Sequence, residues 1–323
     1  MAATAPVRLT SKAAARRPLA GWVVLGALAP IGLFLAWLPS RVGLWVGRRL
    51  GDLAWALLRG RRAMAMANLA RGLGRERTDA ERARIARSSF QHLGMNLVES
   101  CVFFFRPPAV LLSRVELRDA ERLHVGAAEG RGVLLLTGHF GNWELLAASH
   151  ALSGRTLSVV MRPLDAPLLD RLVARFRLRT GAELIAKRRG LRDVLDALRR
   201  GRMVGVLLDQ NASRSEGVFV PFFGVPASTS KSLALIALRT RTPVVPVFIR
   251  RLPDGRHRVE VDPPVEAPVD GDVVVYTAAF NRAVEAAIRR APEQWLWLHD
   301  RWKTRPRGEG HSEGGSRPPS EPP

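Results

Sequence analysis

Short apolar segments alternate with amphipathic ones from residue 78 onwards, and this alternation limits the possible folds more than any other feature of the sequence. Five segments have the pattern of buried strands: 133–136, 157–161, 203–208, 244–249 and 257–261. Helical patterns occupy 78–105, 142–152, 165–180, 190–200, 228–240 and 272–291. Because strands separated by helices usually pair in parallel and are covered on both faces, the sequence predicts an α/β fold with a mixed, largely parallel sheet flanked by helices.

The longest run without a charged residue, Pro18–Ser40, predicts an N-terminal membrane-anchoring helix. Its 23 residues are enough to span a hydrocarbon core of roughly 30 Å. Trp22 and Trp37 lie near its two ends, where interfacial aromatic residues are expected. A kinked, shallowly inserted helix and a cleaved signal peptide are the alternatives, although signal peptides have only roughly 7–15 apolar residues. Basic residues flank the run on both sides, so the loop charges give no orientation.

The charge balance is strongly basic. The chain has 50 Lys and Arg against 29 Asp and Glu, a net charge of +21, and residues 1–80 alone carry 13 basic and 3 acidic residues. Such a balance implies an anionic partner, which can be nucleic acid, an anionic membrane or an acidic carrier protein. Residues 41–77 mix apolar side chains with arginines, as in a helix that lies on an anionic membrane. An ordinary core helix with a solvated basic face gives the same pattern.

Composition divides the chain into three parts. Residues 1–45 form the basic N-terminus with the anchor, residues 46–303 form the main domain, and residues 304–323 are rich in Gly, Pro, Ser and charge. This last part cannot build a core and is predicted to be a disordered tail. Cys101 is the only cysteine, which excludes an intrachain disulfide and a cysteine-rich zinc site.

Candidate catalytic chemistry lies in the segment VLLLTGHFGNWELL, residues 133–146. His139 follows the strand, Asn142 is a preferred N-cap residue, and Glu144 falls in the first turn of the next helix. Because the chain bends sharply between them, His139 and Glu144 can converge, as a general base and the carboxylate that orients it do. No G-x-S-x-G motif is present, so a hydroxyl of the substrate is the expected nucleophile.

The segment His139–Glu144 resembles the H-x4-(D/E) signature of glycerolipid acyltransferases, and its GHFGNWE form resembles that of the late lauroyl/myristoyl-type acyltransferases of lipid A biosynthesis. Further blocks resemble this family in the same order: Met161–Asp165, Arg175–Gly181, Asp209–Gln210, Gly217–Gly224, Thr242–Phe248 and Pro292–Lys303. The similarity covers residues 20–304. Asp300 departs from the family pattern, in which a basic residue is more usual.

The resemblance implies transfer of a fatty acyl chain from a thioester on acyl carrier protein to a hydroxyl of a membrane glycolipid, a Kdo-bearing lipid A precursor. It implies no cofactor, a location in the bacterial inner membrane and a catalytic domain that faces the cytoplasm. Acyl-coenzyme A-dependent acylation of phosphatidylinositol mannosides is the alternative, since enzymes of that kind share the layout. The signature F-P-E-G-T-R-S is missing, so glycerol phosphate is not the expected acceptor.

Roles for individual residues follow from the same resemblance. His139 is expected to be the base, Glu144 to hold its tautomer, and Arg162 to contact a lipid phosphate or the phosphopantetheine of the donor. The remaining predicted substrate-binding residues are Asn142, Arg179, Asp209, Phe222 and Phe223, the two phenylalanines as part of an acyl groove. A solvated helix face for Arg179, and ordinary core packing for the phenylalanines, are the competing interpretations.

Two hypotheses come from other classes of protein. A membrane-tethered nucleic-acid-binding protein would explain the positive charge, but no recognised nucleic-acid-binding module is present. A metal-dependent hydrolase would use His139, Glu144 and His150, but His150 should face away from the other two on the predicted helix. No metal and no nucleic acid are therefore expected.

Overall fold

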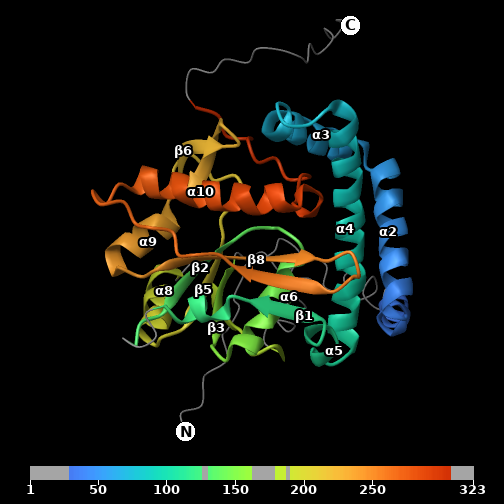
Figure 1. Cartoon of the computed structure of the whole chain (residues 1–323), viewed down its shortest axis with the longest axis horizontal. Helices are drawn as coiled ribbons and strands as arrows, with labels where there is room; N and C mark the ends of the chain where they lie inside the picture. The colour runs from blue at the N-terminus through green and yellow to red at the C-terminus, as the bar shows by residue number, and fades with distance from the viewer. Residues whose placement is uncertain (1–28, 126–129, 162–178, 187–189, 307–323) are drawn as a thin grey trace, which may run out of the picture.

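The computed structural model of the protein describes residues 29–125, 130–161, 179–186 and 190–306 (Figure 1). Four of the sequence predictions fall wholly or largely outside these ranges: the first part of the anchor, Arg162 with its block, the helix over 165–180 and the tail. Residues 29–37, the later part of the predicted anchor, are helical. Among the helices of the described ranges, none is both long enough and apolar enough to cross a membrane.

A seven-stranded sheet with the order β1-β9-β8-β2-β5-β3-β4 forms the centre of the molecule. Its strands are β1 (Val115–Arg118), β2 (Val133–Thr137), β3 (Leu157–Met161), β4 (Glu183–Ala186), β5 (Met203–Leu207), β8 (Val244–Arg251) and β9 (His257–Val261). All neighbouring pairs are parallel except β8 and β9. The predicted α/β fold with a mixed, largely parallel sheet is thereby confirmed. All five predicted strands are present, and β1 and β4 were not predicted.

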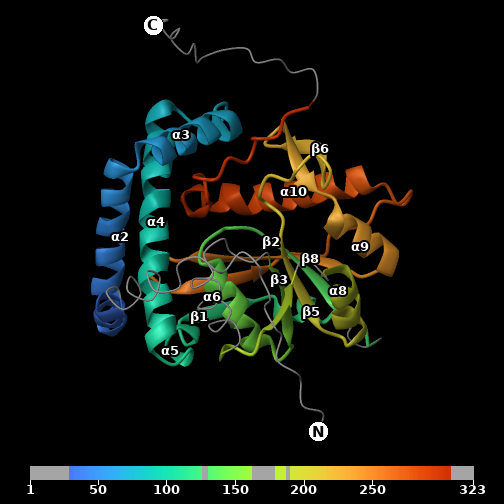
Figure 2. The same ribbon diagram turned by 180° about the vertical axis from the view of Figure 1, so that it is seen from behind.

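Helices cover both faces of this sheet (Figure 2). The α6 helix (Trp143–Ala148) and the 3-10 turn η3 (Ser149–Ser153) lie on one face. The helices α8 (Gly190–Arg199), α9 (Ser232–Thr240) and α10 (Val273–Arg290) lie on the other. Side chains of β2 alternate between the two cores, so Leu135 packs toward α6 and Leu134 and Leu136 pack toward α9 and α10.

A separate hairpin, β6 (Gly217–Phe222) and β7 (Val225–Ser230), corrects one prediction. The helix expected over 228–240 begins only at Ser232, because residues 228–230 pair with residues 217–219. Phe223 and Gly224 form the two-residue turn, with φ values of 51° and 75°. Positive φ at both turn residues matches the right-handed twist of the flanking strands.

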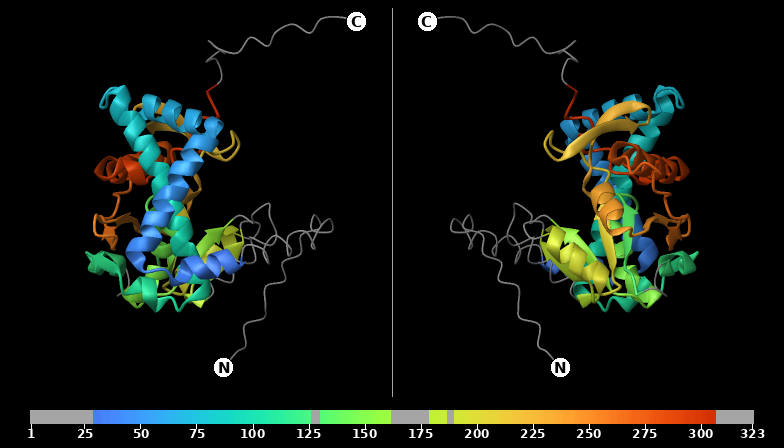
Figure 3. Two further views of the ribbon diagram at one scale, coloured as in Figure 1. Left: turned by 90° about the vertical axis from the view of Figure 1, so that its right-hand side faces the viewer. Right: turned by 90° about the vertical axis from the view of Figure 1, so that its left-hand side faces the viewer.

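Three helices near the N-terminus stack beside the sheet. The helix predicted from residue 78 is confirmed as α4 (Asp79–Phe105), and Thr78 closes a capping box with Glu81. The α2 helix (Ser40–Leu57) packs on α4 and forms the outermost layer, and α3 (Arg59–Leu73) crosses one end of α4 (Figure 3). Short elements complete the chain: α5 (Ala109–Leu112), η1 (Ala120–His124) and η5 (Pro292–Gln294).

Candidate active site

His139 and Asp209 meet at the carboxyl ends of two adjacent parallel strands. In the register of β2 and β5, Thr137 lies opposite Leu207, and each functional residue follows two positions later. The imidazole Nδ1 lies 2.9 Å from Oδ1 of Asp209, and the backbone N–H of His139 donates to Oδ2 at 2.8 Å. Because an ionised carboxylate only accepts hydrogen bonds, the proton lies on Nδ1, and Nε2 keeps the lone pair that a base needs.

The Asp209 carboxylate is 2 % exposed and is ionised at neutral pH. Burial alone would raise its pKa. The charge of His139, the two hydrogen bonds from that residue and a 2.8 Å hydrogen bond from the indole Nε1 of Trp295 oppose burial and lower the pKa of Asp209 to about 2. A buried anion of this kind fixes the imidazole and stabilises its protonated form.

Asp209 takes the place at His139 that was expected for Glu144. Its Oδ1 lies at Nδ1 of the imidazole, although Asp209 was predicted to bind substrate. The physical reason is the strand register, which brings two residues 70 positions apart into contact. Glu144 itself is half-buried in the first turn of α6.

The Nε2 side of His139 is lined by polar and aromatic side chains. The amide nitrogen of Gln210 lies 3.2 Å from Nε2. The Trp143 ring packs edge-on against the imidazole with the ring centroids 5.2 Å apart.

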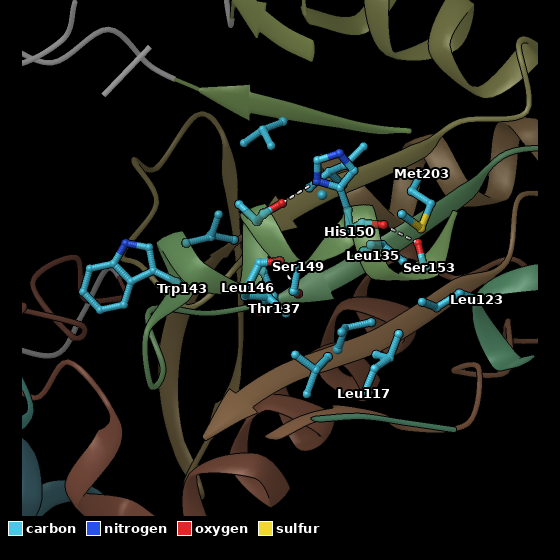
Figure 4. A pocket seen from close by; sticks show the side chains of 17 residues that line it. Leu117, Leu123, Leu135, Thr137, Trp143, Leu146, Ser149, His150, Ser153 and Met203 are labelled. Atoms are coloured by element: carbon cyan, nitrogen blue, oxygen red, sulfur yellow. Dashed lines mark hydrogen bonds between the residues drawn. The ribbon is translucent and has the colours of Figure 1, made fainter. Parts of the chain in front are cut away.

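Next to this pair, an apolar pocket, which we call the cavity, lies between the sheet and α6–η3 (Figure 4). Figure 4 shows Trp143 at one end of the cavity and Met203 and Leu123 at the other. Its wall includes Leu135, Leu146, Leu157, Gly205, Leu207 and Val247. Burial lowers the pKa of His150, another lining residue, whose Nδ1 bonds to the carbonyl of Ala147 at 2.7 Å. Because most of its lining side chains are apolar, the cavity is suited to a hydrocarbon chain.

Asn142, predicted to bind substrate, is the N-cap of α6. Its Oδ1 accepts from the backbone N–H of Leu145 at 3.0 Å, and its Nδ2 donates to Glu99 at 2.7 Å. The side chain is 3 % exposed. Gly141, just before it, has φ +58°, and a Cβ there would lie 1.9 Å from the carbonyl oxygen of Ile249. Only glycine fits this part of the turn.

A buried polar network, which was not predicted from the sequence, supports the turn at Gly141 and Asn142. The carboxylate of Glu99 on α4 accepts from both terminal nitrogens of Arg251 and lies 2.9 Å from Nε2 of His257. Asn96 joins the network to the turn, because its amide bonds to Arg251 and to the carbonyl of Gly141. No sequence signal identifies this network, since charged residues are rarely buried.

The C-terminal block, residues 292–303, contacts the same turn through hydrogen bonds. The side chain of Gln294 makes two hydrogen bonds to the backbone of Arg251. The backbone carbonyl of Gln294 accepts from Gly141 N–H at 2.9 Å. Leu296 N–H donates to the carbonyl of His139 at 3.1 Å. These contacts explain why a segment far from residue 139 in sequence belongs to the same site.

Phe222 and Phe223, predicted to line an acyl groove, are packed in the core, as in the competing interpretation. They are 0 % and 8 % exposed. Phe222 packs on Trp295 and Trp302, and Phe223 packs on Trp297. Both therefore support the tryptophans of the C-terminal block rather than the cavity.

Arg179 is exposed, and it donates to the carbonyl of Phe104 at 3.0 Å. It thus satisfies a carbonyl at the end of α4, where a cation is favoured by the helix dipole. Arg162 lies outside the described residues. Within the described ranges, no three His, Cys, Asp or Glu side chains are grouped so as to hold a metal ion.

Comparisons with known proteins show the family of the chain. The sequence model of the bacterial lipid A biosynthesis acyltransferases matches residues 10–304. The chain is 32% identical over 284 residues to the lipid A biosynthesis lauroyltransferase of Escherichia coli (strain K12), which covers 86% of this chain and 92% of that protein. It is 30% identical to the palmitoleoyltransferase and 26% identical to the myristoyltransferase of the same organism, over 86% and 89% of this chain and 91% and 88% of those proteins. The chain therefore belongs to the bacterial lipid A biosynthesis acyltransferase family and is an acyltransferase.

Proposed function

We propose that this acyltransferase moves a fatty acyl chain from the thioester of acyl carrier protein to a hydroxyl of a Kdo-bearing lipid A precursor. The observation that carries the proposal is the His139–Asp209 pair beside an apolar cavity. The activities for which the relatives are named support lipid A as the class of acceptor. The net charge of +21 supports an acidic carrier protein as donor. The thioester is already activated, so the reaction needs no cofactor.

In the proposed reaction, Nε2 of His139 takes the proton from the acceptor hydroxyl as its oxygen attacks the thioester carbonyl. The new C–O bond forms, the C–S bond then breaks, and the imidazolium returns its proton to the departing thiolate. Asp209 holds the Nδ1 proton throughout and stabilises the imidazolium. Glu144, on the first turn of α6, is retained as a second carboxylate whose charge favours the same protonated form.

We place the donor's acyl chain in the cavity. Met203, Gly205 and Leu207 line it from one face of β5, so a chain would run beside the strand from the end nearest Asp209. Four residues of strand cover about 13 Å at about 3.3 Å each. Arg162 is retained as the proposed contact of a lipid phosphate or of the phosphopantetheine, because a guanidinium binds phosphate with two parallel hydrogen bonds.

The proposed location is the bacterial inner membrane, with the catalytic domain on its cytoplasmic side, in accordance with the family resemblance. The predicted anchor within Pro18–Ser40 and an anionic membrane surface as partner are part of this proposal. The three-part division of the chain at residues 45 and 303 is retained with it.

The proposal is tested by acyl transfer followed by mass spectrometry. Membranes that contain the protein receive acyl carrier protein thioesters of several chain lengths and a Kdo-bearing lipid A precursor. We expect the precursor to gain the mass of one acyl group, and membranes without the protein to give no gain. Transfer only from coenzyme A thioesters to mannosylated phosphatidylinositol would support the alternative acceptor, and no transfer to either would contradict the proposal.

Replacing Gly205 by valine is expected to shift the donor preference toward shorter chains. The added methyl groups enter the cavity midway along β5, and a lost methylene contact changes selectivity by about 10-fold or more. Gly205→Ala is the matched control, because a Cβ at residue 205 meets only Leu157 Cδ1, at 3.4 Å. The measurement compares transfer rates from donors of increasing length. If the valine variant is active and its ratio of rates between short and long donors is unchanged, the acyl chain does not occupy this cavity.

A further inference from the structure

The hydroxyl of Thr137 is a buried polar group in the apolar wall of the cavity (Figure 4). Thr137 is 7% exposed, and its Oγ1 has no hydrogen-bond partner among the described residues. On the same face of the sheet, Leu135 precedes it on β2 and Leu207 lies opposite it on β5. An unsatisfied buried hydroxyl destabilises a fold, and valine would fill the same space without this cost. Packing alone therefore does not account for a threonine at this position.

The other hydroxyl and imidazole side chains of the wall are already bonded to the protein. Ser149 and Ser153 each donate to a backbone carbonyl at 2.7 Å. The imidazole Nδ1 of His150 also bonds to a backbone carbonyl at 2.7 Å. Among the hydroxyl groups of the described wall, the one on Thr137 is thus left for a ligand.

Thr137 lies at the end of the cavity next to the catalytic base. It is the last residue of β2, and His139 follows two positions later, so their Cα atoms are no more than about 7 Å apart. Trp143 packs against the imidazole of His139 and also lines the cavity. A reacting carbonyl carbon lies about 3–3.5 Å from the attacking oxygen, which is itself about 3 Å from the base. The thioester is therefore expected between the imidazole and the hydroxyl of Thr137.

An acyl thioester supplies the hydrogen-bond acceptor that this hydroxyl lacks. Its hydrocarbon chain has no polar atom, and its sulfur is only a weak acceptor, so the carbonyl oxygen is the group that a hydroxyl would bind. During attack this oxygen becomes negatively charged. A donor that is already in place, in a site that excludes water, stabilises such a charge strongly.

We propose that the Thr137 hydroxyl donates a hydrogen bond to the thioester carbonyl oxygen and stabilises the negative charge that this oxygen acquires. The inference rests on the proposed function, which places the acyl chain in this cavity, and it adds the group that binds the reacting carbonyl. As the acceptor oxygen bonds to the carbonyl carbon, the π electron pair of the C=O bond moves onto the oxygen that Thr137 contacts. When this pair returns, the C–S bond breaks and the thiolate takes the proton from the imidazolium of His139. Thr137 keeps its own proton throughout.

The test replaces Thr137 by valine, which removes the hydroxyl and keeps the shape, and by serine, which keeps the hydroxyl. We expect Thr137→Val to lower kcat about 10²–10³-fold, the effect of removing one such donor, with KM for the thioester nearly unchanged. Thr137→Ser should stay within about 10-fold of the wild type, because its hydroxyl can still donate. Urea unfolding should show the valine variant to be at least as stable as the wild type, since it loses an unsatisfied buried hydroxyl.

Thr277→Val is the matched control, because it makes the same change on the other face of the sheet. Thr277 is fully buried on α10, and its Oγ1 donates to the carbonyl of Val273 at 2.7 Å. We expect this variant to transfer acyl groups at the normal rate and to unfold at a slightly lower urea concentration. The two valine variants thus distinguish a hydroxyl that acts on the substrate from one that serves the fold.

The outcomes separate this inference from the proposed function. A folded Thr137→Val variant with nearly normal kcat would overturn the inference and leave the proposed function standing, and a raised KM alone would count in the same way. Equal losses of kcat in the valine and serine variants would also overturn it. A wild-type protein that transfers no acyl group from any thioester would instead fault the proposed function, together with the inference that rests on it.

Discussion

Replacing Asp209 by asparagine is expected to lower the rate of acyl transfer by about 10²–10⁴-fold. Among the described residues, this carboxylate accepts three hydrogen bonds: two from His139 and one from Trp295. Asparagine has only one accepting oxygen, and an NH₂ group replaces the other. This NH₂ group either faces an N–H donor or forces the imidazole into the tautomer that is protonated on Nε2. In that tautomer Nε2 carries the proton and cannot act as a base.

Further variants show whether the loss of rate comes from the His139–Asp209 pair. His139→Ala should be at least as inactive as Asp209→Asn, and the double variant should lose little more, because the two residues act as a unit. Glu144→Gln should be the milder change if Asp209 orients the imidazole. The measurement is kcat/KM for transfer, with urea unfolding of each variant to show that it is folded. A folded Asp209→Asn variant with near-normal rates would contradict the mechanism.

The strands that carry the site could be predicted from the sequence, whereas the side-chain contacts within the site could not. Buried-strand patterns at 133–136 and 203–208 correspond to β2 and β5, and His139 and Asp209 each follow one of them. That β2 and β5 are neighbours is a matter of strand order, which periodicity does not contain. Without the order, Glu144 was the natural partner for His139, because it is the nearest carboxylate along the chain.

The buried contacts could not be predicted from the sequence for a related reason. Glu99 and Arg251 lie 152 positions apart, and each taken alone looks like a surface residue. Phe222 and Phe223 carry no mark that separates a groove from a core, because both environments select aromatic side chains. Their burial follows from the β6–β7 hairpin, in which residues 228–230 form strand although their pattern favoured a helix.

Replacing Glu99 by alanine is expected to lower the free energy of unfolding by about 3–5 kcal/mol. The change leaves the Arg251 guanidinium buried at 6 % exposure without its carboxylate. Burial raises the pKa of Glu99, but the charges and hydrogen bonds of Arg251 and His257 outweigh it, and the net pKa lies well below 4.5. The pair therefore contributes stability above about pH 4.5, and this contribution is lost as the pH falls below that value. Urea unfolding of the wild type and the variant at pH 7 measures the lost stability, and the same comparison at pH 4 measures its dependence on pH.

Glu116→Ala is the matched control, because this carboxylate also pairs with arginines but is 37% exposed. Its loss should leave the free energy of unfolding nearly unchanged, because exposed ion pairs contribute little to stability. The double variant Glu99→Met, Arg251→Met removes both charges and should recover most of the lost stability. It should not recover acyl transfer, because Asn142 and Asn96 would still lack the partners that hold the turn after His139. A double variant that regained both stability and rate would show that the network serves the fold alone, whereas recovery of stability without rate separates the two roles.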